Sequence, residues 1–165
     1  MIRTLIADDD ALLRAALRTM VDWEALGYTL VWDCTNGLQV LELLQRTTVD
    51  LLITDMKMPL LDGLGLIRRL RQSALLPVTV VLSGYDEYEL VREAFRLGAH
   101  DYLLKGNLDT ASLTAMLTEL RPASLPTAAP QRPPPPGPSW PRAVTGWRYL
   151  RWTTWPGSPT GSGAT

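Results

Sequence analysis

Residues 49–63 of the chain read VDLLITDMKMPLLDG, a short apolar run followed by an acid and a loop-forming segment. Its apolar part, up to Thr54, is short and does not alternate with polar residues, which is typical of a strand covered by helices on both faces. Asp55 follows this run directly. In open parallel sheets, ligands bind outside the carboxyl ends of the strands, so Asp55 stands where such a sheet places its chemistry.

Working outward from this stretch, short apolar runs alternate with helix-period segments five times. The alternation is typical of parallel strands joined by crossover helices and predicts a doubly wound α/β sheet. The expected strands are Arg3 to Ala7, Thr29 to Asp33, Asp50 to Thr54, Val78 to Leu82 and Asp101 to Leu104, and the expected helices are Ala11 to Met20, Leu38 to Arg46, Leu64 to Arg71, Glu87 to Leu97 and Asp109 to Leu120.

The ends of several expected helices carry recognisable capping residues. Asn36 with Gln39, and Asp86 with Glu89, have the spacing in which a cap accepts from a first-turn amide and the later side chain reaches back. Gly98 follows an expected helix at the position where a left-handed residue is favoured. These local signals agree with the alternation of strands and helices.

The composition of the chain changes near residue 120. Residues 1–120 contain all 17 acidic residues and 11 of the 16 basic ones, whereas the last 45 residues contain 5 arginines, no acid, 11 of the 13 prolines and 4 of the 6 tryptophans. We therefore predict one domain, 1–120, and a disordered Pro/Gly/Trp-rich tail, 121–165. The segment 142–155, RAVTGWRYLRWTTW, has enough arginine and tryptophan for a small membrane-surface or nucleic-acid patch. It is too short to form a core, so we favour disorder, or a tail produced by a frameshift or truncation.

Several classes of protein are excluded by simple counts. The single cysteine, Cys34, allows neither an internal disulfide nor a cysteine-based zinc site and is expected to be a small residue near a strand. No stretch approaches the roughly 18 apolar residues of a spanning helix, and Asp8 to Asp10 interrupt the N-terminus before a signal peptide could form. We predict a cytoplasmic protein without membrane contact, whose acidic main domain does not bind DNA by itself.

Carboxylates follow two of the expected strands. Asp8, Asp9 and Asp10 follow the first strand, and Asp55 follows the third. Like charges this close repel unless a cation lies among them, and an all-oxygen set suits a hard ion such as Mg²⁺. Asp10 is expected to cap the first helix, so Asp8 and Asp9 are the predicted metal ligands together with the acid of the third strand.

The fourth and fifth strands end in complementary groups. Ser83 offers a hydroxyl to a phosphoryl oxygen, and the ammonium of Lys105 could pair with a carboxylate before reaction and with a phosphoryl group afterwards. Each residue alone would more often be a loop or solvated residue. Together with the acids they form the set that reversible phosphorylation of a carboxylate requires.

The motifs around these strand ends resemble a known family. ADDD at 7–10, DMKMPLLDG at 55–63, LSGYDEYE at 82–89 and DYLLK at 101–105, in this order and spacing, look like the receiver domain of bacterial two-component response regulators. The match covers residues 2 to about 120. It implies a flavodoxin-like five-stranded parallel sheet of order 2-1-3-4-5, and a phosphoacceptor that assists its own phosphorylation and dephosphorylation rather than an enzyme of the ordinary kind.

The resemblance also implies roles, partners and a cofactor. A sensor histidine kinase would be the phosphodonor, a receiver homodimer could form, and Mg²⁺ would be the cofactor. The resemblance implies that Asp55 is the phospho-acceptor and that Mg²⁺ is bound by Asp8, Asp9, Asp55 and the backbone carbonyl of Lys57. It implies phosphoryl contacts for Ser83 and Lys105. Tyr102 would be the aromatic switch, although it could also simply pack within its strand.

Some positions depart from or refine the family pattern. The family usually has a proline after the lysine, whereas this chain has Gly106, and we expect a slightly less fixed Lys105 rather than a dead site. Met56 and Lys57 occupy positions that vary in the family and tune dephosphorylation. The stretch 21–37, VDWEALGYTLVWDCTNG, is similar to receivers that precede AraC-type DNA-binding domains, for which the residues after 120 are too short, so we read the chain as a truncated transcriptional regulator.

Two other functions stay open at this point. DDDALL at 8–13 resembles the Asp-x-Asp opening of haloacid-dehalogenase-type aspartyl-phosphate hydrolases, with Asp8 as nucleophile, although the cap domain of that family is missing. The other is a remnant that binds a kinase without any output. It shares the receiver chemistry and differs only in the meaning of the tail.

Overall fold

The structure is a computed structural model that describes residues 1–73, 77–84 and 87–123. The predicted tail, including its segment 142–155, therefore lies outside the described residues apart from the end of the last helix. The boundary between domain and tail remains a prediction.

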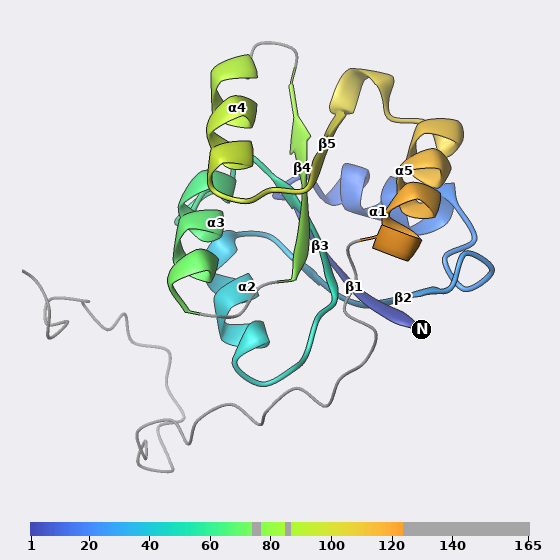
Figure 1. Ribbon diagram of the computed structural model, residues 1–165, viewed down its shortest axis with the longest axis horizontal. Helices are drawn as coiled ribbons and strands as arrows, with labels where there is room; N and C mark the ends of the chain where they lie inside the picture. The colour runs from blue at the N-terminus through green and yellow to red at the C-terminus, as the bar shows by residue number, and fades with distance from the viewer. Residues whose placement is uncertain (74–76, 85–86, 124–165) are drawn as a thin grey trace, which may run out of the picture. The chain divides into compact units, whose positions relative to one another are not determined.

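Five parallel strands form one sheet in the order β2-β1-β3-β4-β5, as predicted (Figure 1). The order places β1 and β3 side by side in the middle, so the chain reverses its direction of progress between them. Ligands of doubly wound sheets bind at this kind of reversal. The strands are β1 (Ile2–Ala7), β2 (Tyr28–Cys34), β3 (Leu51–Asp55), β4 (Val78–Ser83) and β5 (Asp101–Leu104).

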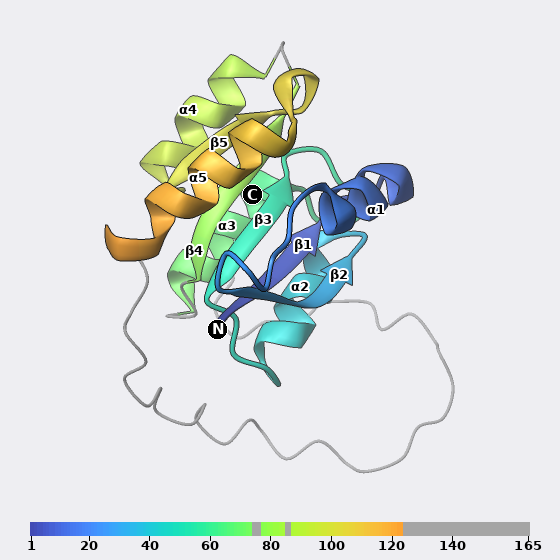
Figure 2. The same cartoon turned by 90° about the vertical axis from the view of Figure 1, so that its right-hand side faces the viewer.

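Helices cover both faces of the sheet. In the views of Figures 1 and 2, α2, α3 and α4 lie on one face, and α1 and α5 lie on the other. The helices are α1 (Ala11–Met20), α2 (Gly37–Leu44), α3 (Gly63–Gln72), α4 (Tyr88–Arg96) and α5 (Thr110–Ala123), and a short 3-10 helix, η1 (Lys105–Asn107), follows β5. The last helix runs three residues past its predicted end.

The hydrophobic core has two layers because successive residues of a buried strand point to opposite faces. Ile6 and Ile53 pack toward α1 and α5, where Leu17 and Leu113 meet them. The neighbouring residues of the same strands pack toward α2 and α3. All residues of β3 and β4 are buried, which explains why their sequences do not alternate. The residues of the second layer include Leu5, Leu52, Val40, Leu66 and Leu70.

The predicted caps can be checked at several helix ends. The Asp10 carboxylate accepts hydrogen bonds from Leu12 N at 2.8 Å and Leu13 N at 3.3 Å, as expected of a cap. The side chain of Asn36 accepts a hydrogen bond from Gln39 N at 3.0 Å. In return, Gln39 Oε1 accepts from the backbone N–H of Thr35, one residue before the predicted partner, Asn36.

The two predicted signals at the ends of α4 have different outcomes. Gly98 has a φ of 102°, which confirms the left-handed position after α4. Asp86, the predicted cap of α4, lies outside the described residues. Glu87 occupies the cap position instead, and its side chain makes no capping hydrogen bond.

Tyr28 ties the edge strand β2 to α5. Its ring is fully buried, it meets Trp23 edge-on with ring centroids 6.4 Å apart, and its hydroxyl donates to the carbonyl of Leu117 at 2.6 Å. Replacing Tyr28 by Phe keeps the ring and removes this hydrogen bond. We expect the free energy of unfolding to fall by about 1 kcal/mol, the net value of one buried hydrogen bond.

Urea denaturation measures this change. Tyr88→Phe is the matched control, because Tyr88 is 73% exposed, and it should change the free energy of unfolding by much less. Equal stability of Tyr28→Phe and the parent would show that the hydroxyl contributes nothing.

Candidate functional site

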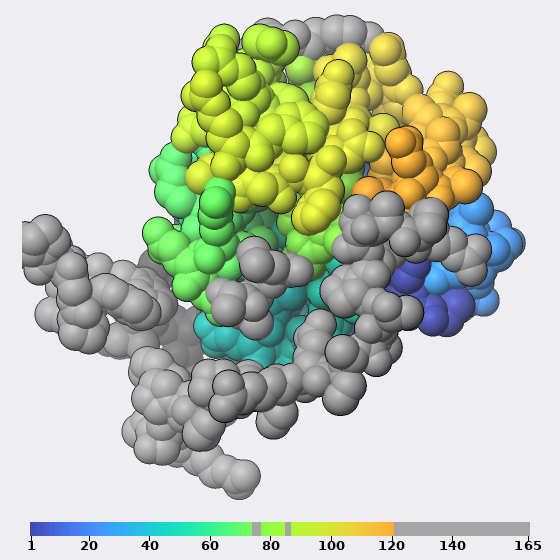
Figure 3. All heavy atoms as spheres, viewed as in Figure 1, coloured from blue at the N-terminus to red at the C-terminus, as the bar shows by residue number. Residues whose placement is uncertain are grey.

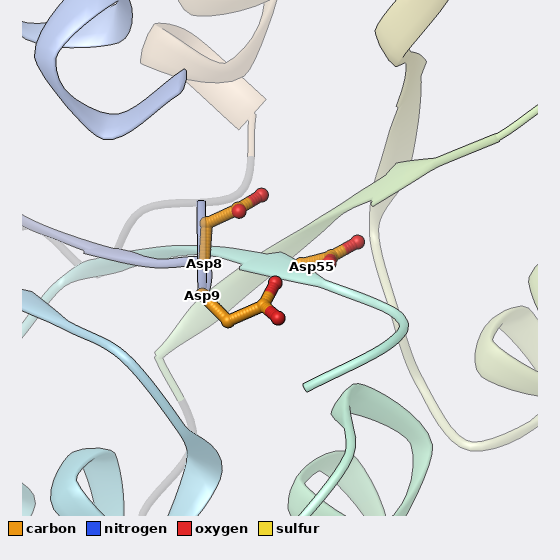
Figure 4. A group of neighbouring side chains, drawn as sticks. All are labelled: Asp8, Asp9 and Asp55. Atoms are coloured by element: carbon orange, nitrogen blue, oxygen red, sulfur yellow. The ribbon is translucent and has the colours of Figure 1, made fainter. Parts of the chain in front are cut away.

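The acids of two neighbouring strands meet at the carboxyl edge of the sheet. β1 pairs with β3 so that Ala7 lies opposite Thr54, and the next residue of each strand carries a carboxylate. Figure 4 shows Asp8 and Asp9 extending from the end of β1 toward the same space as Asp55. One carboxylate oxygen from each of the three lies within 4.8 Å of the others. The register of the two strands therefore gathers the residues that the sequence pointed to.

The three carboxylates differ in exposure. Asp8 is fully buried, Asp55 is 3% exposed, and Asp9 is exposed. The set thus opens to solvent on the side of Asp9 and closes against the sheet on the other. A set of oxygen ligands with one open side fits a hard divalent cation that keeps some of its waters.

Lys105 supplies the positive charge between the two buried acids. Its Nζ atom lies 2.9 Å from Asp8 Oδ2 and 2.9 Å from Asp55 Oδ1. The residue comes directly after β5, and its side chain is 29% exposed. A single ammonium therefore compensates two carboxylates whose burial would otherwise be costly.

These surroundings shift the titration of both partners. Burial raises the pKa of Asp55, and the hydrogen bond and charge of Lys105 oppose this rise without cancelling it. For Lys105 burial works to lower the pKa, but the hydrogen bonds and charges of Asp55 and Asp8 outweigh it, so the pKa is raised. Lys105 is therefore held in its charged form, whereas ionised Asp55 is held at a cost.

Arg14 supports the turn that carries the first two acids, and no motif in the sequence singles it out. Its Nη1 donates to the Asp8 carbonyl at 2.7 Å, and its Nε lies 3.3 Å from Asp33 Oδ2 on β2. The Asp8 carboxylate itself accepts from Asp10 N at 2.8 Å. Helix α1 and strand β2 thus hold the turn after β1 in place. An arginine four residues into a helix is usually solvated, so no sequence signal distinguished it.

Ser83 ends β4 with an unused hydroxyl. The residue is fully buried and lies opposite Leu104 in the pairing of β4 with β5. Its Oγ atom makes no hydrogen bond to any residue that the structure describes. Buried hydroxyls normally have a hydrogen-bond partner. A buried hydroxyl without one, at the end of the strand next to β5, could therefore bind a ligand oxygen.

The loop after Asp55 approaches the acceptor strand very closely. The Lys57 N–H hydrogen-bonds the Asp55 carboxylate, which works to lower its pKa. Gly63 N donates to the Met56 carbonyl at 3.0 Å, and a Cβ atom at Gly63 would overlap the carbonyl oxygen of Asp55. Within this loop Leu60 has a φ of 68°, a strained value for a residue other than glycine.

Tyr102, the predicted switch residue, points partly outward in this structure. It is 42% exposed and meets Phe95 of α4 edge-on, with ring centroids 6.0 Å apart. A cavity of about 430 Å³ lies between α4 and β5, with Ser83, Tyr102 and Leu104 among its lining residues. The face built by α4, β5 and α5 is the one that Figure 3 shows.

Glu87 is a second residue that no sequence motif marks as part of the site. Although acidic, it is only 6% exposed. Its Oε2 accepts from Gly84 N at 2.7 Å, and its Oε1 lies 2.9 Å from Lys57 Nζ. The sequence contains several acids in this region, and only the structure separates the buried Glu87 from the exposed Glu89.

Comparison with known proteins identifies the family. The model of the response regulator receiver domain matches residues 4–118. The chain belongs to this family. The receiver resemblance, the sheet order and the classification as a two-component phosphoacceptor domain are thereby confirmed.

The receiver is similar to domains of named regulators. It is 37% identical to the uncharacterized transcriptional regulatory protein YesN of Bacillus subtilis, over 64% of this chain and 28% of that protein. It is 32% identical to the transcriptional regulatory protein HptR of Staphylococcus aureus, over 73% of this chain and 46% of that protein. The chain therefore spans less than half the length of these curated relatives.

A solved structure shows the same fold. The receiver domain of AraT, a response regulator from Geobacillus stearothermophilus, superimposes with a TM-score of 0.64 and 36% identity. The match covers 72% of this chain and 93% of that domain.

The receiver assignment also decides between the two phosphoryl chemistries considered from the sequence. The hydrolase reading used Asp8 as the nucleophile, but Asp8 is fully buried, with one carboxylate oxygen on Asp10 N and the other on Lys105. That reading is not favoured.

Among the described residues no helix is both long enough and apolar enough to cross a membrane.

Neutralising Asp55 should stabilise the metal-free receiver. Because its pKa is raised in the folded protein, the folded state binds a proton at Asp55 more tightly than the unfolded chain does. Ionised Asp55 therefore lowers stability above its folded pKa, and this cost disappears as the pH falls through that pKa. We expect Asp55→Asn to melt at a higher temperature than the parent at pH 8 in EDTA, with a smaller difference in mildly acidic buffer.

Glu119→Gln is the control for this comparison, because it removes the same charge from an exposed position on α5. It should leave the melting temperature nearly unchanged at both pH values. A lower melting temperature for Asp55→Asn at pH 8 would show that the ion pair with Lys105 outweighs burial.

Proposed function

We propose that this receiver takes a phosphoryl group onto Asp55 from a sensor histidine kinase and passes the signal on through its α4–β5–α5 face. The observation that carries the proposal is the site itself. Three carboxylates lie within 4.8 Å of one another, Lys105 Nζ is 2.9 Å from two of them, and the buried Ser83 hydroxyl is unused among the described residues.

In the proposed reaction a carboxylate oxygen of Asp55 bonds to phosphorus. The phosphorus–nitrogen bond of the kinase phosphohistidine breaks, and the imidazole leaves with that electron pair. Lys105 and Ser83 would then bind phosphoryl oxygens, since one carries a positive charge and the other an open hydroxyl. A hollow of about 450 Å³ beside the acids, with Asp9, Lys57 and Leu90 among its lining residues, offers room for the donor.

Mg²⁺ is the proposed cofactor. Asp8, Asp9, Asp55 and the backbone carbonyl of Lys57 would hold it, since all are oxygen donors at one edge of the sheet. When bound, the ion neutralises part of the charge on the transferring group. The open side at Asp9 supports this assignment, because Mg²⁺ keeps several waters.

Loss of the phosphoryl group would complete the cycle. A water would attack phosphorus, the bond to Asp55 would break, and the carboxylate would be regenerated as inorganic phosphate leaves. The receiver would thus assist its own dephosphorylation without acting on a separate substrate.

The output side of the proposal concerns Tyr102. We propose that it turns into the cavity between α4 and β5 when Ser83 moves toward the phosphoryl group. Both residues line that cavity, which supports a link between site and surface. A homodimer through this face, a role in transcription and a cytoplasmic location complete the proposed picture, and the receiver by itself is not expected to bind DNA.

Phosphorylation with a small-molecule donor tests the acceptor directly. Incubated with acetyl phosphate and Mg²⁺, the parent protein should gain the mass of one phosphoryl group, and Asp55→Asn should gain none. Chelation of Mg²⁺ by EDTA should prevent the gain. Intact-mass spectrometry is the measurement.

The matched control is Asp50→Asn, which changes the acid just before the other end of the same strand. Asp50 accepts from Arg3 N at 2.8 Å, a bond that an asparagine can keep, so this variant should be labelled as the parent is. Labelling of Asp55→Asn at the parental rate would refute the proposal.

A further inference from the structure

Glu87 joins two loops that meet at the phosphorylation edge of the sheet. Asp55 lies opposite Leu82 in the pairing of β3 with β4, and Lys57 and Gly84 each follow two residues later. The carboxylate of Glu87 contacts both of these later residues, with Oε2 at 2.7 Å from Gly84 N and Oε1 at 2.9 Å from Lys57 Nζ. One buried side chain therefore couples the loop after β3 to the loop after β4.

The bond to Gly84 involves a group next to the open hydroxyl of the site. Gly84 N–H directly follows Ser83, whose Oγ is buried and unsatisfied among the described residues. A carboxylate on that amide holds the start of the β4–α4 loop by its backbone. A backbone movement of Ser83 toward Asp55 would carry Gly84 with it and would strain this hydrogen bond.

The negative charge of Glu87 bears on how the contact responds to phosphorylation. Glu87 is 6% exposed, so its negative charge is weakly screened. A phosphoryl group on Asp55 would bring further negative charge to the same edge, and it would compete with Glu87 for donors on both loops. A phosphoryl group would attract the same positively polarised groups, Lys57 Nζ and the Gly84 amide, that Glu87 contacts in this structure.

We propose that Glu87 is a positioning residue that holds the two loops in the unphosphorylated arrangement and thereby opposes phosphorylation. The inference rests on the proposed function of Asp55. In the resting receiver the carboxylate of Glu87 occupies the Gly84 amide and the Lys57 ammonium. Phosphorylation weakens both contacts, so the strength of the Glu87 contacts sets how readily the receiver adopts its phosphorylated form.

Beryllium fluoride with saturating Mg²⁺, a noncovalent mimic of the phosphoryl group, is the probe. In the full chain, Glu87→Gln removes the negative charge and leaves the size of the side chain unchanged. We expect it to bind beryllium fluoride about five-fold more tightly than the parent does, a typical size for coupling between two sites. Isothermal titration calorimetry measures the affinity, and a thermal melt without ligand should show a lower melting temperature.

Glu93→Gln is the matched control. Glu93 also lies on the α4 side and pairs with a basic residue of the preceding helix, Arg68, at 2.6 Å, but both side chains are about half exposed. Its affinity for beryllium fluoride should equal that of the parent. An equal gain in Glu93→Gln would mean that any lost negative charge tightens binding, and it would overturn the proposal.

Unchanged or weaker binding by Glu87→Gln, with normal binding by the parent, would show that Glu87 has only a structural role. Should Glu87→Gln fail to fold, Glu87→Asp tests the same idea, because a side chain one methylene shorter cannot span both partners, and tighter binding is again expected. Failure of the parent itself to bind would refute the proposed function of Asp55, and this inference with it.

Discussion

The ammonium of Lys105 between Asp8 and Asp55 is the interaction on which the rest of the site depends. Two buried carboxylates that share one edge of the sheet repel each other and are costly to desolvate without a compensating charge. Lys105 provides it at 2.9 Å from each. The three residues come from three different strand ends, so this balance exists only when the sheet has its observed order and register.

The strand between the acids and the lysine has its own part in this arrangement. β4 lies between β3 and β5, and it places Ser83 at the same edge. The close approach at Gly63 and the strained backbone of Leu60 keep the loop after Asp55 tight against the strand. The buried charges and the strained backbone, which lower stability, thus lie at one edge of the sheet, whereas the rest of the sheet packs in an ordinary apolar core. Such a concentration of unfavourable local choices is typical of functional sites.

Long side chains add a second set of contacts around this edge. Arg14 reaches from α1 to the carbonyl of Asp8, and Glu87 reaches from the start of α4 to Gly84 and Lys57. Both connect a helix to a loop that carries site residues. Helix α1 and the start of α4 are therefore tied directly to the turns that carry the site residues.

The amino-acid sequence by itself determined the strands, their parallel arrangement and the residues at the strand ends. Unbroken apolar runs identify buried strands, and a residue that directly follows such a run must lie at the carboxyl edge, so Asp8, Asp9, Asp55, Ser83 and Lys105 could be selected in advance. Only the tertiary structure decided that Lys105 pairs with both buried acids, that Tyr102 packs outward on Phe95, and that Arg14 and Glu87 belong to the site. These contacts could not be predicted because they join residues from different segments of the fold. A strand end is placed by short-range periodicity, whereas the partner of a long charged side chain depends on which distant segments the fold brings within hydrogen-bonding distance.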